Sequence, residues 1–143
     1  MKVLVVDDSV VEQVRVKALL EKLGHEIVLA SNGVDALETY AATQPGLILL
    51  DVMMPVMDGL ETARRIRALS VPWTPIVFLS GNVEPEDIAS GIEAGGDDYL
   101  SKPVNALVLG AKLMAIQRIA NMKSLITQPG ASGLVKEIVD LAE

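Results

Sequence analysis

Residues 47–59 read LILLDVMMPVMDG: four large aliphatic residues lead directly into Asp51, and a proline and an Asp-Gly pair follow. An aliphatic run without polar alternation is typical of a strand that is covered on both faces, as in a parallel sheet. A carboxylate that only increased solubility could lie almost anywhere on the surface, so its position at the end of a buried strand indicates a function. The segment therefore predicts a buried strand that presents the Asp51 carboxylate in a loop built for a function.

Four further apolar runs of similar length alternate with segments of helical character. The runs cover residues 2–6, 26–30, 75–80 and 98–100, and the helical segments cover residues 9–23, 34–42, 59–69, 85–94 and 105–126. Val11, Val14 and Ala18 recur at helical spacing in the first helical segment, and Ile88 and Ile92 do so in the fourth. Strands that alternate with helices form a parallel sheet with right-handed crossovers. The sequence thus predicts a doubly wound α/β fold, with five parallel strands and helices on both faces.

Composition limits the functions that this chain can have. Its 143 residues, half of them hydrophobic, are enough for one ordinary domain with a sizeable core. A net charge of −7 and an aromatic content of 3% argue against direct binding of nucleic acid, which needs basic and stacking side chains. The absence of cysteine excludes thiolate metal sites, and no apolar run approaches the ~18 residues that span a membrane. We expect a soluble, cytoplasmic, acidic protein.

Polar side chains follow four of the five predicted strands. Asp7 and Asp8 follow the first strand, Asp51 the third, Ser80 the fourth and Lys102 the fifth. In an open doubly wound sheet these strand ends meet where ligands bind. Three carboxylates in one cleft repel one another unless a cation joins them, and Mg²⁺ binds carboxylates and phosphate oxygens together. Because aspartate can act as a nucleophile toward phosphoryl groups, the pattern predicts magnesium-dependent phosphoryl transfer.

The motifs VVDDS, LLDVMMPVMDG, FLSG and DDYLSKP, in this order and spacing, resemble the receiver domain of bacterial two-component response regulators. The resemblance covers residues 1–123 and leaves residues 124–143 as a C-terminal extension or linker. It implies a flavodoxin-like sheet with strand order 2-1-3-4-5. It also implies a signalling protein, not an enzyme, that is phosphorylated by a histidine kinase, a phosphotransfer protein or a small phosphodonor. An output domain or a downstream protein would then respond.

The resemblance assigns a role to each residue at the strand ends. Asp51 matches the phosphoacceptor, and Asp7 and Asp8 match the acidic pair that binds Mg²⁺ together with Asp51. The backbone carbonyl of Met53 matches a further protein ligand of the metal. Lys102 matches the lysine that contacts the phosphoryl group, and by analogy its bond to the following proline is cis.

Two further residues match the parts that report phosphorylation. Ser80 matches the switch hydroxyl, and Tyr99 matches the aromatic residue whose ring turns inward when that hydroxyl moves. The affected surface would be the fourth helix, the fifth strand and the fifth helix. Two copies could pair through this face or through the long C-terminal helix.

Simpler and competing interpretations exist for several of these residues. Ser9 and Glu12 fit a capping box at a helix start, and Asp58 fits a helix cap followed by Gly59. Taken by itself, Ser80 reads as a turn residue. A haloacid-dehalogenase-like phosphatase would place a second aspartate two residues beyond the first, where this chain has Ser9. A structural pseudo-receiver would lack Asp51, Lys102 or a member of the Asp7–Asp8 pair, and this chain lacks none of them.

The C-terminal end is the least informative part. The helical pattern from residue 105 is longer than a sheet of this size needs, and the break TQPGASG precedes a short pattern in which Leu134, Ile138 and Leu141 share one face. Two hypotheses follow: a single-domain receiver, or the receiver part of a longer regulator, which the long helix favours.

Overall fold

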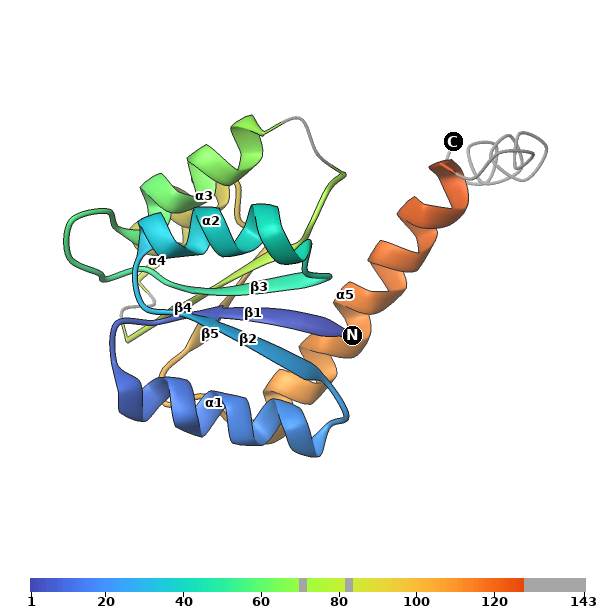
Figure 1. Cartoon of the computed structure of the whole chain (residues 1–143), viewed down its shortest axis with the longest axis horizontal. Coiled ribbons are helices and arrows are strands. Elements are labelled where there is room, and N and C mark those ends of the chain that lie inside the picture. The colour runs from blue at the N-terminus through green and yellow to red at the C-terminus, as the bar shows by residue number, and fades with distance from the viewer. Residues whose placement is uncertain (70–71, 82–83, 128–143) are drawn as a thin grey trace. The chain divides into compact units, whose positions relative to one another are not determined.

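The computed structural model describes residues 1–69, 72–81 and 84–127. The five strands are β1 (Lys2–Val6), β2 (Glu26–Ala30), β3 (Leu47–Asp51), β4 (Ile76–Ser80) and β5 (Asp98–Ser101). The helices are α1 (Val10–Lys22), α2 (Gly33–Thr43), α3 (Gly59–Ala68), α4 (Pro85–Ala94) and α5 (Ala106–Thr127). All strand pairs are parallel and the order is β2-β1-β3-β4-β5 (Figure 1), so the predicted fold is confirmed.

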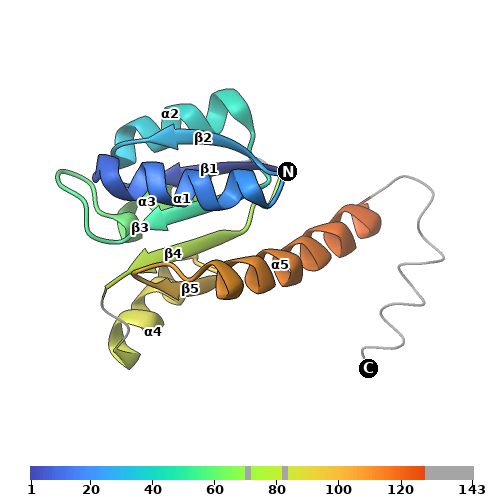
Figure 2. The same ribbon diagram turned by 90° about the horizontal axis from the view of Figure 1, so that it is seen from below.

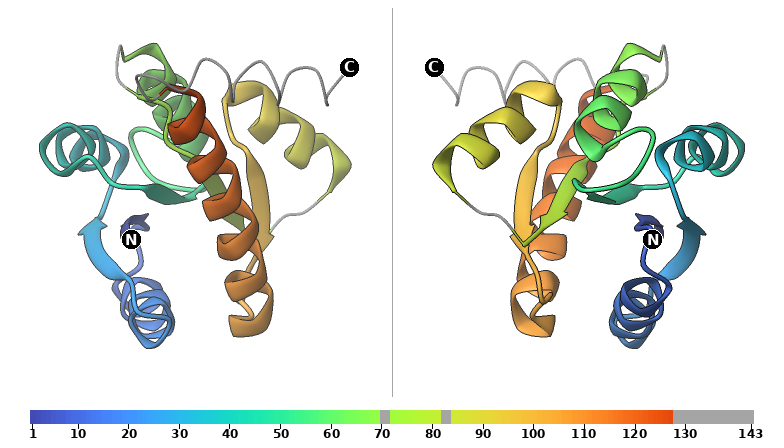
Figure 3. Two further views of the ribbon diagram at one scale, coloured as in Figure 1. Left: turned by 90° about the vertical axis from the view of Figure 1, so that its right-hand side faces the viewer. Right: turned by 90° about the vertical axis from the view of Figure 1, so that its left-hand side faces the viewer.

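Alternate residues of the inner strands face opposite sides of the sheet, and both sides are apolar. On one side Leu4, Ile48 and Phe78 belong to a core that includes Ala36 of α2 and Ala63 of α3. α1 covers the other side (Figure 3), which explains why these strands have no polar alternation. The strand arrowheads all point to one edge in Figure 2, and the loops at this edge carry the candidate site.

Side chains at the helix starts explain where the helices begin. The side chains of Ser9, Asn32 and Asp58 accept hydrogen bonds from backbone N–H groups in the first turns of α1, α2 and α3. The predicted cap at Asp58 is therefore confirmed. The predicted capping box at α1 forms only in half, because the Ser9 N–H donates to Asp7 Oδ1 at 2.9 Å instead of to Glu12.

In two helices the buried residues differ from those that the spacing of apolar residues in the sequence predicts. In α1 the buried residues are Gln13, Val16 and Leu20, whereas Val11 and Val14 are exposed. In α4 the two isoleucines are exposed, and the small residues Gly91 and Ala94 are buried in their place. Close approach of a helix to large side chains on the sheet favours small residues at the contact, and hydrophobicity patterns do not detect them.

The chain divides into two compact units, Met1–Leu109 and Gly110–Glu143, with the division inside α5. The predicted receiver boundary at residue 123 stays a prediction, and the pattern at Leu134, Ile138 and Leu141 lies outside the described residues. Among the residues that the structure describes, no helix is long and apolar enough to cross a membrane.

Candidate functional site

The structure brings the predicted strand-end residues together at the carboxyl edge of the sheet. Asp51 is the last residue of β3, while Asp7 and Asp8 directly follow β1. One carboxylate oxygen from each of these three aspartates lies within 4.8 Å of the others. Lys102, just beyond β5, places its Nζ 3.0 Å from Asp7 Oδ2 and 3.2 Å from Asp51 Oδ1. One ammonium group therefore bridges two carboxylates at the ends of the adjacent strands β1 and β3.

The Asp51 side chain is nearly enclosed, since the residue is 4% exposed. Its Oδ1 accepts a hydrogen bond from the Met53 N–H at 3.4 Å, in addition to the contact with Lys102. Burial, helped by the neighbouring Asp7 charge and opposed by Lys102, raises the pKa of Asp51 from 3.8 to about 6. Asp51 is thus an ionised but weakly solvated carboxylate at neutral pH, which suits a nucleophile.

Asp7 is held at four points. Its Oδ1 accepts the Ser9 N–H, its Oδ2 accepts from Lys102, and its own N–H donates to the Ala30 carbonyl at 3.1 Å. The fourth contact, to its carbonyl oxygen, comes from the side chain of Gln13 at 2.6 Å. By contrast, Asp8 is exposed. The acidic pair therefore combines one fixed, buried carboxylate with one that faces solvent.

Lys102 is oriented by the backbone around it. The Lys102-Pro103 bond is cis, as the resemblance implies, and the Lys102 N–H donates to the Ser80 carbonyl at 2.8 Å. Burial by itself would lower the pKa of Lys102, but the hydrogen bond to Asp7 and the Asp51 charge outweigh it and raise the pKa. The ammonium therefore stays charged beside the Asp51 carboxylate.

The donor set fits a hard divalent cation. Three carboxylates within a few ångströms repel one another, and a single lysine neutralises only part of their charge. Mg²⁺ prefers oxygen ligands and keeps several waters, and the exposed Asp8 gives the cluster an open side where water can remain. Asp7, Asp8 and Asp51 are the residues that would hold it. The role of the Met53 backbone carbonyl as a further metal ligand stays a prediction.

The two predicted switch residues lie on neighbouring strands. Ser80 ends β4 and is buried, and Tyr99 is 8% exposed in β5. The Tyr99 ring packs on Phe78, with centroids 5.8 Å apart and an angle of 44° between the rings. A Cβ at Gly91 of α4 would lie 2.8 Å from Tyr99 Cε2 and 3.0 Å from Phe78 Cδ2. The ring is therefore inside the fold, where Gly91 leaves room for it.

Sequence reasoning missed Phe78 and Gly91 as parts of this arrangement. Phe78 is the only phenylalanine of the chain, but within an apolar strand it reads only as core. Gly91 lies inside α4, where glycine destabilises a helix. A glycine inside a predicted helix therefore indicates a close packing contact, and this was the signal in the sequence that could have identified Gly91.

The loop from Asp51 to α3 returns tightly to the end of β3. The Gly59 N–H donates to the Val52 carbonyl at 2.9 Å, and a Cβ at Gly59 would collide with the Asp51 carbonyl oxygen. Within this loop Val56 has a φ of 69° and a completely exposed side chain. A β-branched residue rarely adopts this conformation, so the loop is strained beside the site.

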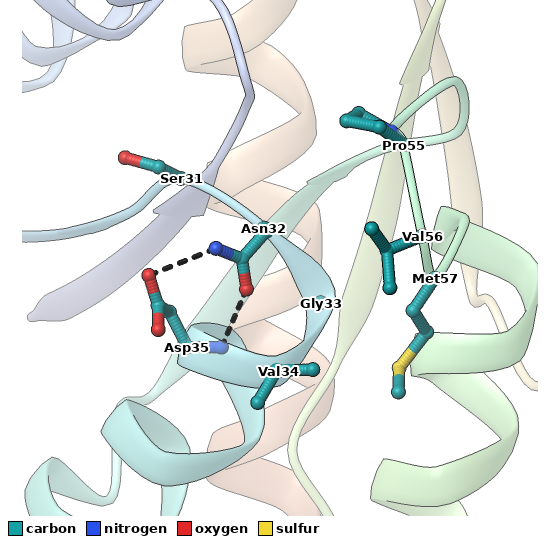
Figure 4. A pocket seen from close by; sticks show the side chains of 8 residues that line it. All are labelled: Ser31, Asn32, Gly33, Val34, Asp35, Pro55, Val56 and Met57. Carbon is teal, nitrogen blue, oxygen red and sulfur yellow. Dashed lines mark hydrogen bonds between the residues drawn. The ribbon is translucent and has the colours of Figure 1, made fainter.

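A groove with a cavity volume of about 370 Å³ lies between this loop and the start of α2. Figure 4 shows Pro55, Val56 and Met57 facing the segment from Ser31 to Asp35. Asn32 and Asp35 hydrogen-bond to each other in this view, so their polar groups serve the start of α2.

Comparisons with known proteins identify the family that this chain resembles. The sequence model of the response regulator receiver domain family matches residues 3–114. The transcriptional regulatory protein CseB of Streptomyces coelicolor is 38% identical over 116 residues, which are 81% of this chain and 49% of CseB. The alkaline phosphatase synthesis transcriptional regulatory protein PhoP of Bacillus subtilis is 37% identical over 82% of this chain and 48% of PhoP. The chain thus spans about half the length of these curated relatives.

Solved structures give the same result for the fold. A two-component response regulator from Clostridium difficile has a TM-score of 0.77 and 33% identity, covering 82% of this chain and 96% of that one. The chemotaxis protein CheY4 of Vibrio cholerae has a TM-score of 0.76 and 34% identity, covering 80% of this chain and 97% of that one.

Proposed function

Because the chain belongs to the response regulator receiver domain family, we propose that Asp51 accepts a phosphoryl group in a magnesium-dependent reaction. The single observation that supports this most strongly is the Lys102 ammonium, 3.2 Å from a buried Asp51 carboxylate that lies beside two further aspartates. The donor would be a histidine kinase, a phosphotransfer protein or a small phosphodonor. The chain would act as a signalling module and not as a metabolic enzyme.

In the proposed reaction an Asp51 carboxylate oxygen forms a bond to phosphorus. The phosphorus–nitrogen bond to the donor's histidine breaks, and the imidazole nitrogen leaves with the electron pair. Lys102 balances the negative charge of the phosphoryl oxygens, and the Ser80 hydroxyl donates a hydrogen bond to one of them. Bound Mg²⁺ would neutralise further phosphoryl charge. Low solvent access at Asp51 would slow hydrolysis of the resulting acyl phosphate.

Phosphorylation would replace the single negative charge of the Asp51 carboxylate by about −1.5 to −2 charges on the phosphoryl group, together with new hydrogen-bond acceptors. We propose that Ser80 moves toward this charge and that the Tyr99 ring turns into the space that Ser80 vacates. These movements would shift the equilibrium between two conformations of the surface formed by α4, β5 and α5. An output domain, a downstream protein or a second copy of the chain would bind one of these arrangements. Pairing of copies through this face or through the long α5 belongs to the same proposal.

Incubation with acetyl phosphate and Mg²⁺ tests the proposal. We expect a mass gain of one phosphoryl group that is stable in acid and labile in base, and its loss in Asp51→Asn. Asp35→Asn, which changes an exposed aspartate on α2, is the matched control and should be labelled normally. Normal labelling of Asp51→Asn would refute the assignment of the phosphoacceptor.

A further inference from the structure

Gln13 is a polar residue on the buried face of α1. It is 6% exposed and shares this face with the aliphatic residues Val16 and Leu20. Its Nε2 lies 2.6 Å from the Asp7 carbonyl oxygen, 3.1 Å from Ser31 Oγ and 3.4 Å from the Ala30 carbonyl oxygen. A carboxamide nitrogen has two N–H groups, so the two shorter contacts are the main hydrogen bonds.

These contacts join the ends of two adjacent strands. Asp7 follows β1 and Ala30 ends β2, and the Asp7 N–H already donates to the Ala30 carbonyl. Gln13 adds a bond from α1 to the Asp7 carbonyl and a second one to Ser31, at the start of the β2–α2 connection. The backbone that carries the Asp7 side chain is therefore fixed from the sheet and from the helix.

An aliphatic side chain of similar size would fill this space without burying an amide. It would, however, leave the Asp7 carbonyl without its side-chain donor, and leaving a buried polar group unpaired is unfavourable. The shortest of the contacts, at 2.6 Å, goes to the residue that also holds Lys102 through its carboxylate. The position of Gln13 is thus tied to the acidic pair and not only to the core.

We propose that Gln13 is a positioning residue for the metal site: its carboxamide fixes the backbone of Asp7 and thereby the orientation of the Asp7 and Asp8 carboxylates toward a divalent cation. This inference rests on the proposed function, in which these carboxylates bind Mg²⁺. Residues that orient metal ligands typically change metal affinity by about 10–100-fold when they are replaced. We expect Gln13→Met, which keeps the size and removes both donors, to raise the Kd for Mg²⁺ about tenfold.

The test measures Mg²⁺ binding to the unphosphorylated protein by isothermal titration calorimetry, and unfolding by urea in EDTA. Val16→Ala is the control for general loosening, because Val16 is buried on the same face of α1. Gln117→Met makes the same chemical change at an exposed position of α5. Should Gln13→Met not fold, Gln13→Ala replaces it.

The expected result is weaker Mg²⁺ binding by the Gln13 variant only, with wild-type affinity in Val16→Ala and Gln117→Met. An unchanged Kd in the Gln13 variant overturns the inference. Equal weakening in Val16→Ala also overturns it, since the effect would then follow from loss of stability. If the wild-type protein itself does not bind Mg²⁺, the proposed metal site fails, which is a separate result from either of these.

Discussion

Replacing Asp51 by asparagine should stabilise the metal-free protein at neutral pH. The pKa of Asp51 rises from 3.8 to about 6 on folding, mainly through burial and then through the Asp7 charge. A shift of about 2 units at 1.36 kcal/mol per unit means that ionised Asp51 costs the folded state roughly 3 kcal/mol. Asparagine removes this cost but keeps a side-chain oxygen that can accept from Lys102 and from the Met53 N–H.

The sign of the pH dependence follows from the direction of the shift. The folded-state pKa of Asp51 lies above the unfolded value, so its stabilising contribution is complete below about pH 4 and is lost as the pH rises through about 6. Asparagine does not titrate. The difference in unfolding free energy between Asp51→Asn and the wild-type protein should therefore be small near pH 4 and largest above pH 7.

Urea unfolding in EDTA between pH 4 and 8 measures this difference directly. Thermal unfolding should show a rise in Tm of roughly 10 °C for Asp51→Asn at pH 8, at about 3–5 °C per kcal/mol for a chain of this size. Saturating Mg²⁺ should stabilise the wild-type protein more than the variant and reduce the gap. A gap that is independent of pH, or a variant that is less stable at pH 8, would refute the electrostatic reasoning.

Three further changes test other parts of the site. Lys102→Ala removes the ammonium between Asp7 and Asp51, and should slow phosphorylation by acetyl phosphate roughly a hundredfold, whereas Lys17→Ala on the exposed side of α1 should not. Gly91→Ala should displace the Tyr99 ring and lower the free energy of unfolding in urea by about 1–3 kcal/mol, whereas the control Ser90→Ala should not. The NMR chemical shifts of the Tyr99 ring report its displacement, and unchanged shifts would contradict the packing argument. Val56→Asn should raise stability by about 1 kcal/mol, because asparagine tolerates a positive φ and the valine side chain buries nothing; a loss of stability would show that the loop conformation is not strained.

The strands and the gathering of the site were predictable because both follow from short-range patterns. An apolar run bounded by polar residues marks a covered strand, and parallel strands bring Asp7, Asp51 and Lys102 to one edge whatever the details of packing. The helix faces were not predictable in the same way. Gln13 and Gly91 are buried for reasons that lie on other elements, namely the Asp7 carbonyl and the Tyr99 ring.

Gly59 has a consequence for how substitutions in this chain should be interpreted. In a saturation mutagenesis experiment we expect position 59 to tolerate as few residues as position 51, although glycine carries no functional group. Any side chain at 59 would meet the main chain of Asp51, the proposed phosphoacceptor. Loss of function after a substitution at Gly59 would therefore result from a clash between two backbone segments. Sensitivity of a position to substitution does not by itself show that its residue takes part in the reaction.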